Sequence, residues 1–417
     1  MALSVYSTKD NQWREYYNPL RGLSIPKMVS LLEAGERGQY ADLQWCYYYM
    51  ERSDPMIFSV LQRRRAALLD CDWDVRKVAP EPGAFRHAGR RLRITGPVDD
   101  VLAQEQVDCL RAVYDGIENF DDAVSFLFTG VSRGFAHLEK NYGPDGGIVR
   151  LEPVEQWFWL RDGMFAGWEY NQNAVSGRRR GVPIDPDNFL IMETTALNRM
   201  LSLLYLRRVI SQRDWDAYLN VFGIPPVFLI GPPNAVGDKE KEYQAIAEEL
   251  FSNGRGYLPN GSDIKFVNGG GGRPPYRELL EYIDRQITLI GTGGLLTMLT
   301  ESGSGTLAGG AHSDTFQQIA RGDASTVSDV FQRGIDVPAL AANFPGQPVL
   351  AFFQFAPTTL GAASAVAQDV AALAAAGFTV DPAQVSEKTG YREAPTGPVN
   401  IQQAAVNSDL STVGGGK

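Results

Sequence analysis

The sequence predicts an α+β protein in which two long helices flank a small folded insert. Apolar residues recur at helical spacing before residue 130 and again in residues 195–222 and 275–298. Strand-like alternation and turn signals dominate residues 134–192 instead. Residues 223–268, between the two long helices, hold enough strand and helix signals for a compact unit. No residue in this arrangement is typical of a catalytic centre, so the information lies in the architecture.

The first part of the chain is expected to be helical after an N-terminal arm, residues 1–29, in which prolines and a glycine interrupt any periodicity. Asp54-Pro55 predicts the start of a helix that ends at Leu69, because aspartate can cap the first turn of a helix and the first turn accommodates proline. Residues 71–78 alternate like a strand. Residues 79–98 are rich in glycine, proline and arginine and predict an exposed basic loop or hairpin.

Two further helices are expected at residues 101–117 and 121–129, followed by strands from Gly134 to Met192. Turn-forming residues punctuate this stretch at 141–147, 162–163, 171–177 and 183–188. The first half of the chain is therefore expected to be α+β.

The first long helix is predicted over Thr195–Phe222, about 28 residues or roughly 42 Å. Thr194 or Thr195 is its expected cap, and Gly223 ends it. The insert then reads as a β-α-β-β unit, with strands at residues 226–231, 256–258 and 263–267 and a polar helix at residues 238–253.

Four glycines at residues 269–272 form a hinge before the second long helix, Pro275–Met298, which would span roughly 36 Å. The two helices are expected to run antiparallel. A glycine-rich loop over 299–312 follows, then a helix at 313–332, a strand at 348–355 and two short helices at 368–376 and 382–389. The residues after Pro395 are rich in Gly, Ser, Gln and Asn and predict a flexible tail.

Composition excludes several classes. The formal charge of −10 argues against affinity that depends on neutralising phosphates. Three widely spaced cysteines and three scattered histidines do not form a disulfide framework or a metal site, so no metal and no cofactor are expected. The polar N-terminus lacks the features of a signal peptide, and no apolar run is long enough to cross a membrane. We expect a soluble protein.

The glycine-rich loop at residues 299–312 allows two interpretations. Gly303, Gly305 and Gly309 resemble a dinucleotide fingerprint, but the spacing is GxGxxxG and a helix precedes it where a strand should. The loop is either a mobile segment that contacts a moving partner or a plain linker between helices.

The order of these segments resembles the portal proteins of tailed bacteriophages, in particular the Mu-type portal family. The resemblance runs from about Arg21 to Phe355. It depends on the order and spacing of five segments: Asp54–Arg65 with Trp73–Val75, Arg213–Pro226, Leu258–Gly261, Tyr282–Ile287 with the glycine-rich stretch, and the helix over 313–332.

The resemblance implies a dodecameric ring at one capsid vertex, without catalysis. The implied parts are a wing at residues 30–194 and 313–358, a stem at 195–222 and 269–298, a clip at 223–268, a tunnel loop at 299–312 and a short helical crown at 359–395. A flexible tail, 396–417, completes the chain. Twelve copies at −10 each carry −120 formal charges, which would limit sticking of the DNA passing through the channel.

The resemblance also implies site residues and partners. The implied partners are further copies of the chain, double-stranded DNA, the terminase large subunit, a head–tail connector or adaptor, and the major capsid and scaffold proteins. No membrane is implied; assembly would occur in the host cytoplasm and the product would reside in the virion. The implied tunnel-loop residues are Ser302, Gly303, Ser304, Gly305, Thr306, Leu307, Gly309 and Gly310. Candidates for DNA or inter-subunit contacts on the stem are Arg207, Arg208, Arg277 and Arg285, and candidates for clip contacts are Lys239, Glu240, Lys241 and Glu248.

Two alternatives stay open at this point. The first is a nucleotide- or substrate-binding enzyme that uses the Gly303–Gly310 loop. The second alternative is a head–tail connector. It is the weaker one, because head–tail connector chains are usually much shorter than this chain.

Overall fold

The computed structural model describes residues 20, 22–79, 83–163, 165–172, 181–219, 227–230, 238, 241, 245, 263–266, 275–294, 306–357 and 370–374. The chain divides into two units, Met1–Ala356 and Pro357–Lys417. In the second unit, the described residues 370–374 are helical. No helix in the described part of the chain is both long and apolar enough to span a bilayer.

Three helices open the first unit: α1 (Ile25–Glu36), α2 (Ala41–Ser53) and α3 (Pro55–Leu69). The predicted start of α3 is confirmed. The Asp54 carboxylate accepts hydrogen bonds from the backbone N–H groups of Met56 and Ile57 at 2.9 and 3.0 Å, and Pro55 occupies the first turn. Strand β1 (Cys71–Lys77) follows at the predicted place.

The basic segment, predicted as a loop or a hairpin, forms a hairpin in which β2 (Gly83–His87) pairs antiparallel with β3 (Arg90–Ile94). Helices α4 (Asp100–Asp115), α5 (Phe120–Leu127) and α6 (Thr129–Arg133) come next. They precede a three-stranded sheet in the order β5-β4-β9, in which β4 (Phe135–Tyr142) pairs antiparallel with β5 (Ile148–Val154) and β9 (Phe189–Glu193). A second small sheet holds β6 (Trp159–Arg161), β7 (Trp168–Tyr170) and β8 (Val182–Pro183).

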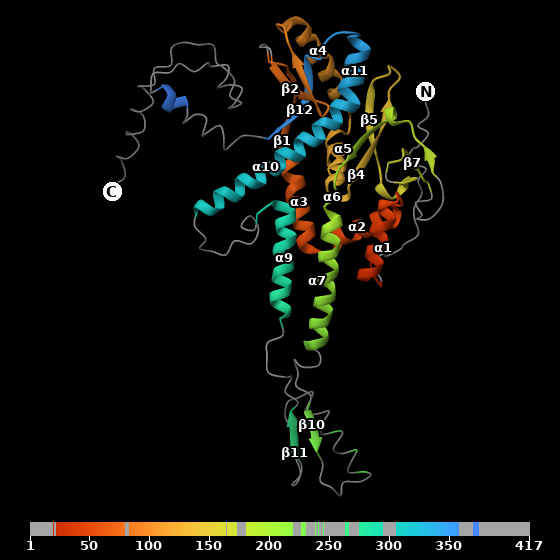
Figure 1. The fold of residues 1–417 in the computed structure, drawn as a ribbon, viewed down its shortest axis with the longest axis vertical. Helices are drawn as coiled ribbons and strands as arrows, with labels where there is room; N and C mark the ends of the chain where they lie inside the picture. The colour runs from red at the N-terminus through yellow and green to blue at the C-terminus, as the bar shows by residue number, and fades with distance from the viewer. Residues whose placement is uncertain are drawn as a thin grey trace, which may run out of the picture. The chain divides into compact units, whose positions relative to one another are not determined.

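The two long helices are α7 (Asn198–Tyr218) and α9 (Tyr276–Thr292), and they lie side by side in Figure 1. The predicted cap of α7 was wrong: the helix begins after Leu197 without a side-chain cap, because the Thr194 hydroxyl donates to the Gly130 carbonyl at 2.7 Å instead. Residues 220–222 of the predicted helix lie outside the described part.

The predicted end of the second long helix was also wrong. α9 stops at Thr292 because Gly293 adopts a left-handed conformation (φ 69°), and its N–H donates to the Leu289 carbonyl at 2.9 Å. Gly293 is also crowded, since an added Cβ would lie 2.8 Å from Ile319 Cδ1.

Between α7 and α9 in sequence, β10 (Val227–Ile230) pairs antiparallel with β11 (Asp263–Phe266). These are two of the three predicted strands of the insert. Asp238, Lys241 and Ala245 are helical, as the predicted polar helix requires. The remaining strand, residues 256–258, lies outside the described residues.

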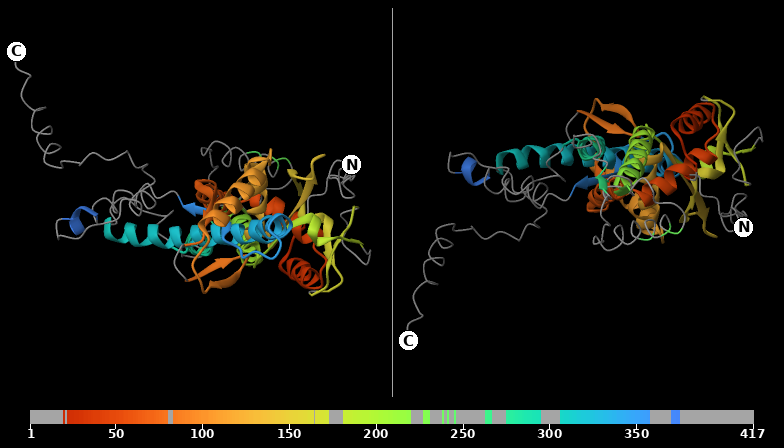
Figure 2. Two further views of the ribbon diagram at one scale, coloured as in Figure 1. Left: turned by 90° about the horizontal axis from the view of Figure 1, so that it is seen from above. Right: turned by 90° about the horizontal axis from the view of Figure 1, so that it is seen from below.

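The helix predicted to begin at residue 313 begins earlier. α10 runs from Thr306 to Phe331 and therefore includes Gly309 and Gly310, since glycine costs a helix only about 1 kcal/mol. A π-helical turn, η5 (Gln332–Asp336), joins it to α11 (Val337–Asn343), and the views in Figure 2 show α10 and α11 as one continuous rod.

Strand β12 (Ala351–Pro357) pairs with β1, although some 280 residues separate them in sequence. The largest hydrophobic core joins the same distant segments. Leu68, Leu110 and Leu138 from the first part of the chain share it with Phe331 and Phe353 from the last part. The described residues within 68–192 and 324–355 therefore fold as one body, interrupted in sequence by the two long helices and their insert.

Candidate functional site

The two long helices are joined along their length by polar and aromatic contacts. The Trp215 and Tyr276 rings are stacked at the far end, with centroids 6.4 Å apart and planes 10° apart. Nearer the body, the Arg208 guanidinium lies 3.4 Å from the Asp284 carboxylate. From the first pair to the second, the residue number falls on α7 and rises on α9, which confirms that the two helices run antiparallel.

Arg208 also anchors the hairpin to the body. Its Nη1 donates to Asp54 Oδ1 at 2.9 Å, the same carboxylate oxygen that caps α3. The Arg208 and Asp54 side chains are only 11% and 3% exposed. Burial raises the pKa of Asp284, and the Arg208 guanidinium partly offsets that rise. The charge of Arg208 is therefore neutralised within its own chain, which gives it a structural role at the junction.

The other predicted stem arginines differ from Arg208. Arg277 donates to Glu281 one turn later at 2.7 Å, so it is already paired on the surface of α9. Arg207 and Arg285 are exposed. Each is next in sequence to a member of the Arg208–Asp284 pair, so the two arginines lie at nearly the same height on the hairpin. Neither has a carboxylate partner among the described residues.

A second buried ion pair, which the sequence did not predict, holds the end of α9 that lies nearest the body. Arg64 on α3 makes a bidentate contact with Asp323 on α10, with donor–acceptor distances of 2.7 and 3.0 Å. Arg64 also reaches the Gly291 carbonyl of α9 at 3.5 Å. One guanidinium thus ties α3 to both α9 and α10. The two residues are 259 positions apart in sequence, so no local pattern could pair them.

Close helix packing accompanies this ion pair. Gly291 lies so near α3 that an added Cβ would be 1.7 Å from Val60 Cγ1. The absence of a side chain at this position lets the backbone of α9 approach α3 directly.

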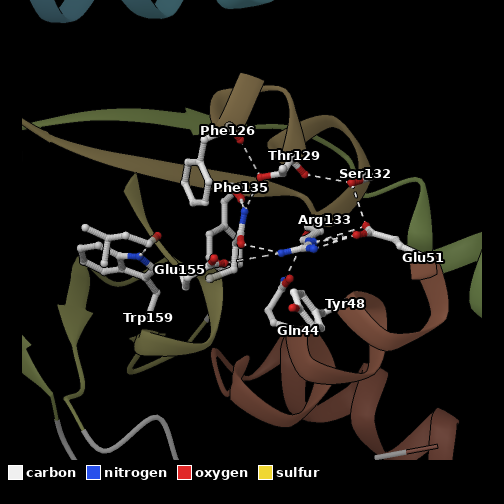
Figure 3. Close-up of polar contacts among 12 residues, drawn as sticks. Gln44, Tyr48, Glu51, Phe126, Thr129, Ser132, Arg133, Phe135, Glu155 and Trp159 are labelled. Atoms are coloured by element: carbon white, nitrogen blue, oxygen red, sulfur yellow. Dashed lines mark hydrogen bonds and ion pairs between the residues drawn. The ribbon is translucent and has the colours of Figure 1, made fainter. Parts of the chain in front are cut away.

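A third buried arginine, Arg133, shares its carboxylate partner Glu51 with the first residue of α7. Figure 3 shows the contacts of Arg133. Arg133 donates to both Glu51 on α2 and Gln156, at 2.7 and 2.8 Å. Glu51 also accepts hydrogen bonds from Ser132 at 3.0 Å and from Asn198, the first residue of α7, at 2.6 Å. Burial alone would lower the pKa of Arg133, but the Glu51 carboxylate more than offsets this and the pKa is raised.

The predicted tunnel-loop residues divide into two groups. Ser302, Gly303, Ser304 and Gly305 lie outside the described residues. Thr306, Leu307, Gly309 and Gly310 belong to the first turns of α10, which corrects the prediction that the loop extends to residue 312. Of the predicted clip residues, Lys239, Glu240 and Glu248 lie outside the described part, whereas Lys241 is exposed and 4.0 Å from Asp238.

The described residues contain no group of three His, Cys, Asp or Glu side chains that could hold a metal ion. His137 is fully buried and stacked on Trp159 at 3.9 Å, and burial holds its pKa well below the usual value. His87 Nε2 lies 3.6 Å from the buried Asp336 carboxylate. Both histidines thus take part in internal packing.

A cavity of about 330 Å³ lies between α1, α2 and the sheet strands, and each charged group that lines it has a partner of opposite charge. Arg161 pairs with Glu193, which also accepts from Trp168 Nε1 at 2.7 Å, and Arg199 pairs with Glu36. Arg161 additionally lies over the Trp168 ring at 3.7 Å. These contacts describe a packed junction rather than a poised catalytic group.

The fold has solved counterparts. A chain in the virion of a native gene transfer agent particle aligns with a TM-score of 0.55 and 13% identity, covering 88% of this chain and 94% of that one. A chain in the neck of a native gene transfer agent particle, computed with C12 symmetry, also aligns with a TM-score of 0.55 and 13% identity, covering 89% and 100%. At this identity the likeness shows a shared fold.

Sequence comparison gives the family. The family described as "Portal protein of Mu bacteriophage" matches residues 44–391, which is most of the chain. The chain therefore belongs to the Mu portal protein family, a family of structural proteins rather than enzymes.

Two curated relatives agree with this assignment. The Mu-like prophage FluMu protein gp29 of Haemophilus influenzae is 23% identical over 347 residues, covering 78% of this chain and 62% of that protein. The portal protein of Escherichia phage Mu is 21% identical over 349 residues, covering 79% and 63%. The chain thus spans less than two thirds of the length of these relatives.

Proposed function

We propose that this chain is a portal protein that assembles as a ring, in twelve copies, at one vertex of a capsid. The ring would be the channel for DNA during packaging and ejection, and the docking platform for the terminase large subunit and a head–tail connector. The observation that carries the proposal is the family match over residues 44–391. The antiparallel α7–α9 hairpin, held to its body by Arg208 and Arg64, supports it as a rigid wall element.

In this proposal, residues 30–194 and 313–358 form the wing, the α7–α9 hairpin forms the stem, and residues 223–268 form the clip. The shared core of residues 68–192 and 324–355 supports a single wing built from two stretches of sequence. Residues 359–395 and 396–417 are proposed as crown and tail, and contact with major capsid and scaffold proteins would fall to the wing. The ring would be assembled in the host cytoplasm and retained in the virion.

The stem arginines are proposed to act differently from one another. Arg208 and Arg277 have acidic partners in their own chain, so they are poor candidates for DNA contacts. Arg285 is exposed and lacks a described carboxylate partner. In an acidic ring, scattered arginines of this kind offer phosphates brief contacts without trapping the duplex.

Particles assembled with Arg285→Ala test this assignment. We expect ring formation to be unchanged and the amount of packaged DNA, measured by quantitative PCR after nuclease treatment, to fall severalfold. Arg277→Ala is the matched control and should package normally, because Glu281 already occupies Arg277. Normal packaging by Arg285→Ala would contradict the proposal that Arg285 contacts DNA in the channel.

The clip and the loop have separate tests. Lys239→Ala together with Lys241→Ala should weaken capture of the terminase large subunit or connector in a pull-down, because both substitutions remove positive charge from the proposed clip. Thermal stability should not change, since Lys241 is exposed. Deletion of Ser302–Gly305, which spares α10, should leave the ring intact and impair DNA packaging or retention. Loss of the ring on this deletion would assign the segment to a subunit contact instead.

A further inference from the structure

Helix α9 carries two apolar stripes, and the residues that the structure describes bury only one of them. Ile283 and Ile287 are buried, and Ile290 packs against the same core. The second stripe lies one residue earlier at each step, about 100° around the helix. It consists of Leu279, Tyr282, Gln286 and Leu289, in which the three apolar side chains are 43%, 54% and 45% exposed.

Helix α7 has a stripe with the same spacing of three, four and three residues. It consists of Met200, Leu203, Arg207 and Ile210. Met200 and Leu203 are 47% and 36% exposed, and Ile210 is half-buried. The core-facing residues of α7 are different ones, Leu201, Tyr205 and Leu206. Each long helix thus presents a regular, partly apolar stripe outside its own core.

The two stripes match in height. Counting from the Arg208–Asp284 contact, five residues toward the body lead to Leu203 on α7 and to Leu289 on α9. Two residues in the other direction lead to Ile210 and Tyr282. Arg207 and Gln286 fall between these two apolar pairs, where a guanidinium can donate to an amide oxygen.

We propose that the α9 stripe of one copy packs on the α7 stripe of the next copy, with Leu289 against Leu203 and Tyr282 against Ile210. This inference depends on the ring of the proposed function. Neighbours in a closed ring are related by rotation without a shift along the axis. In a hairpin that runs along this axis, stripes that match in height within a chain therefore also match between copies. The spacing of three and four residues is that of helix pairs packed side by side.

The partner is a second copy rather than the chain's own hairpin, because both stripes stay exposed although α7 and α9 already pack together through Trp215 and Tyr276. The proposal also separates the two exposed arginines. Arg207 lies within the α7 stripe and contacts the neighbouring copy, whereas Arg285 is outside the α9 stripe and stays available for the channel.

Site-directed cross-linking tests the register. Two differently tagged variants, Leu203→Cys and Leu289→Cys, are co-expressed in a Cys109→Ser background, since Cys46 and Cys71 are buried and Cys109 is partly accessible. A disulfide requires Cα atoms about 5.5–6 Å apart. After oxidation, we expect a dimer carrying both tags, and a ladder of higher oligomers from the double variant. Ile210→Cys with Tyr282→Cys is a second, independent pair.

Leu203→Cys with Glu281→Cys is the control, because Glu281 lies eight residues, or about 12 Å, from Leu289 along α9. Both matched pairs should cross-link at least tenfold more than this control. Intact rings in which neither matched pair exceeds the control would overturn the stripe contact while the proposed function stands. A cross-link confined to single chains of the double variant would also overturn it, and a chain that forms no ring would overturn both proposals.

Discussion

At the residue scale, three buried arginines hold together segments that are far apart in sequence. Arg64, Arg133 and Arg208 each contact a carboxylate on another helix, and each side chain is about a tenth exposed or less. A buried charge left without its partner is costly, whereas an exposed pair contributes little. These three contacts are therefore where single substitutions should have their largest effect on folding.

Replacing Asp323 tests this expectation. Asp323→Ala leaves the Arg64 guanidinium buried without its carboxylate, so we expect the free energy of unfolding to fall by about 3–5 kcal/mol. Lys77→Ala breaks the exposed pair with Asp100 and should cost less than about 1 kcal/mol. Urea denaturation followed by circular dichroism measures both, and equal losses would contradict the special role of the buried pair.

The cysteines give a pH-dependent prediction. Burial raises the pKa of Cys46 to about 12 and that of Cys71 to about 11. Both pKa values lie above the ordinary thiol pKa of 9.0, so the folded chain favours the neutral thiols. The stability that the two neutral thiols contribute is complete below pH 9.0 and is lost as the pH rises through 11 and 12.

At pH 8 the Cys46 and Cys71 thiols of the native chain should therefore not react with a disulfide reagent. In the unfolded chain all three cysteines should react. Absorbance of the released thiolate counts them. Rapid reaction of Cys46 in the native chain would show that its surroundings are open.

At the element scale, the sequence predicted a helix start where the cap lies beside it in the sequence, and it predicted poorly the boundaries that depend on other elements. Asp54-Pro55 encodes its own cap, so the start of α3 was predicted correctly. The end of α9 was not, because Gly293 acts through its left-handed conformation and its fit against Ile319 on α10. Gly309 and Gly310 do not prevent α10 from beginning at Thr306, since a modest local preference does not decide the boundary.

The candidate site shows the same division. Stem arginines could be proposed from the helical pattern, but not which of them are already paired. Arg208 finds Asp54 across 154 residues and Arg64 finds Asp323 across 259. Such pairings depend on the tertiary fold, and a single sequence contains no periodic signal for them.

The contact between α3 and α9 yields an element-scale prediction. Gly291→Ala would place a methyl group against Val60 and force the helices apart, so we expect a loss of about 1–3 kcal/mol in the free energy of unfolding. Gly322→Ala, in α10 with open space around it, should be neutral or stabilising by up to about 1 kcal/mol. Val60→Ala combined with Gly291→Ala should recover part of the loss. Thermal denaturation of the three variants decides the matter, and a stable Gly291→Ala chain would contradict the close packing.

At the scale of the whole molecule, the chain is a discontinuous body interrupted by a helical hairpin and its insert. The β1–β12 pair and the shared core close this body across the interruption. The arrangement lets the hairpin be built into the body at both ends, so that neither helix is a free appendage. A ring of such subunits would have a continuous wall of paired helices around its axis.

Cryo-electron microscopy of the purified chain would show whether this wall encloses a channel. We predict class averages with about twelve copies of the 45.8 kDa chain around a central opening wide enough for duplex DNA, with the α7–α9 hairpins next to the opening. Closed particles without an opening, or single copies with the hairpin folded into the body, would contradict it.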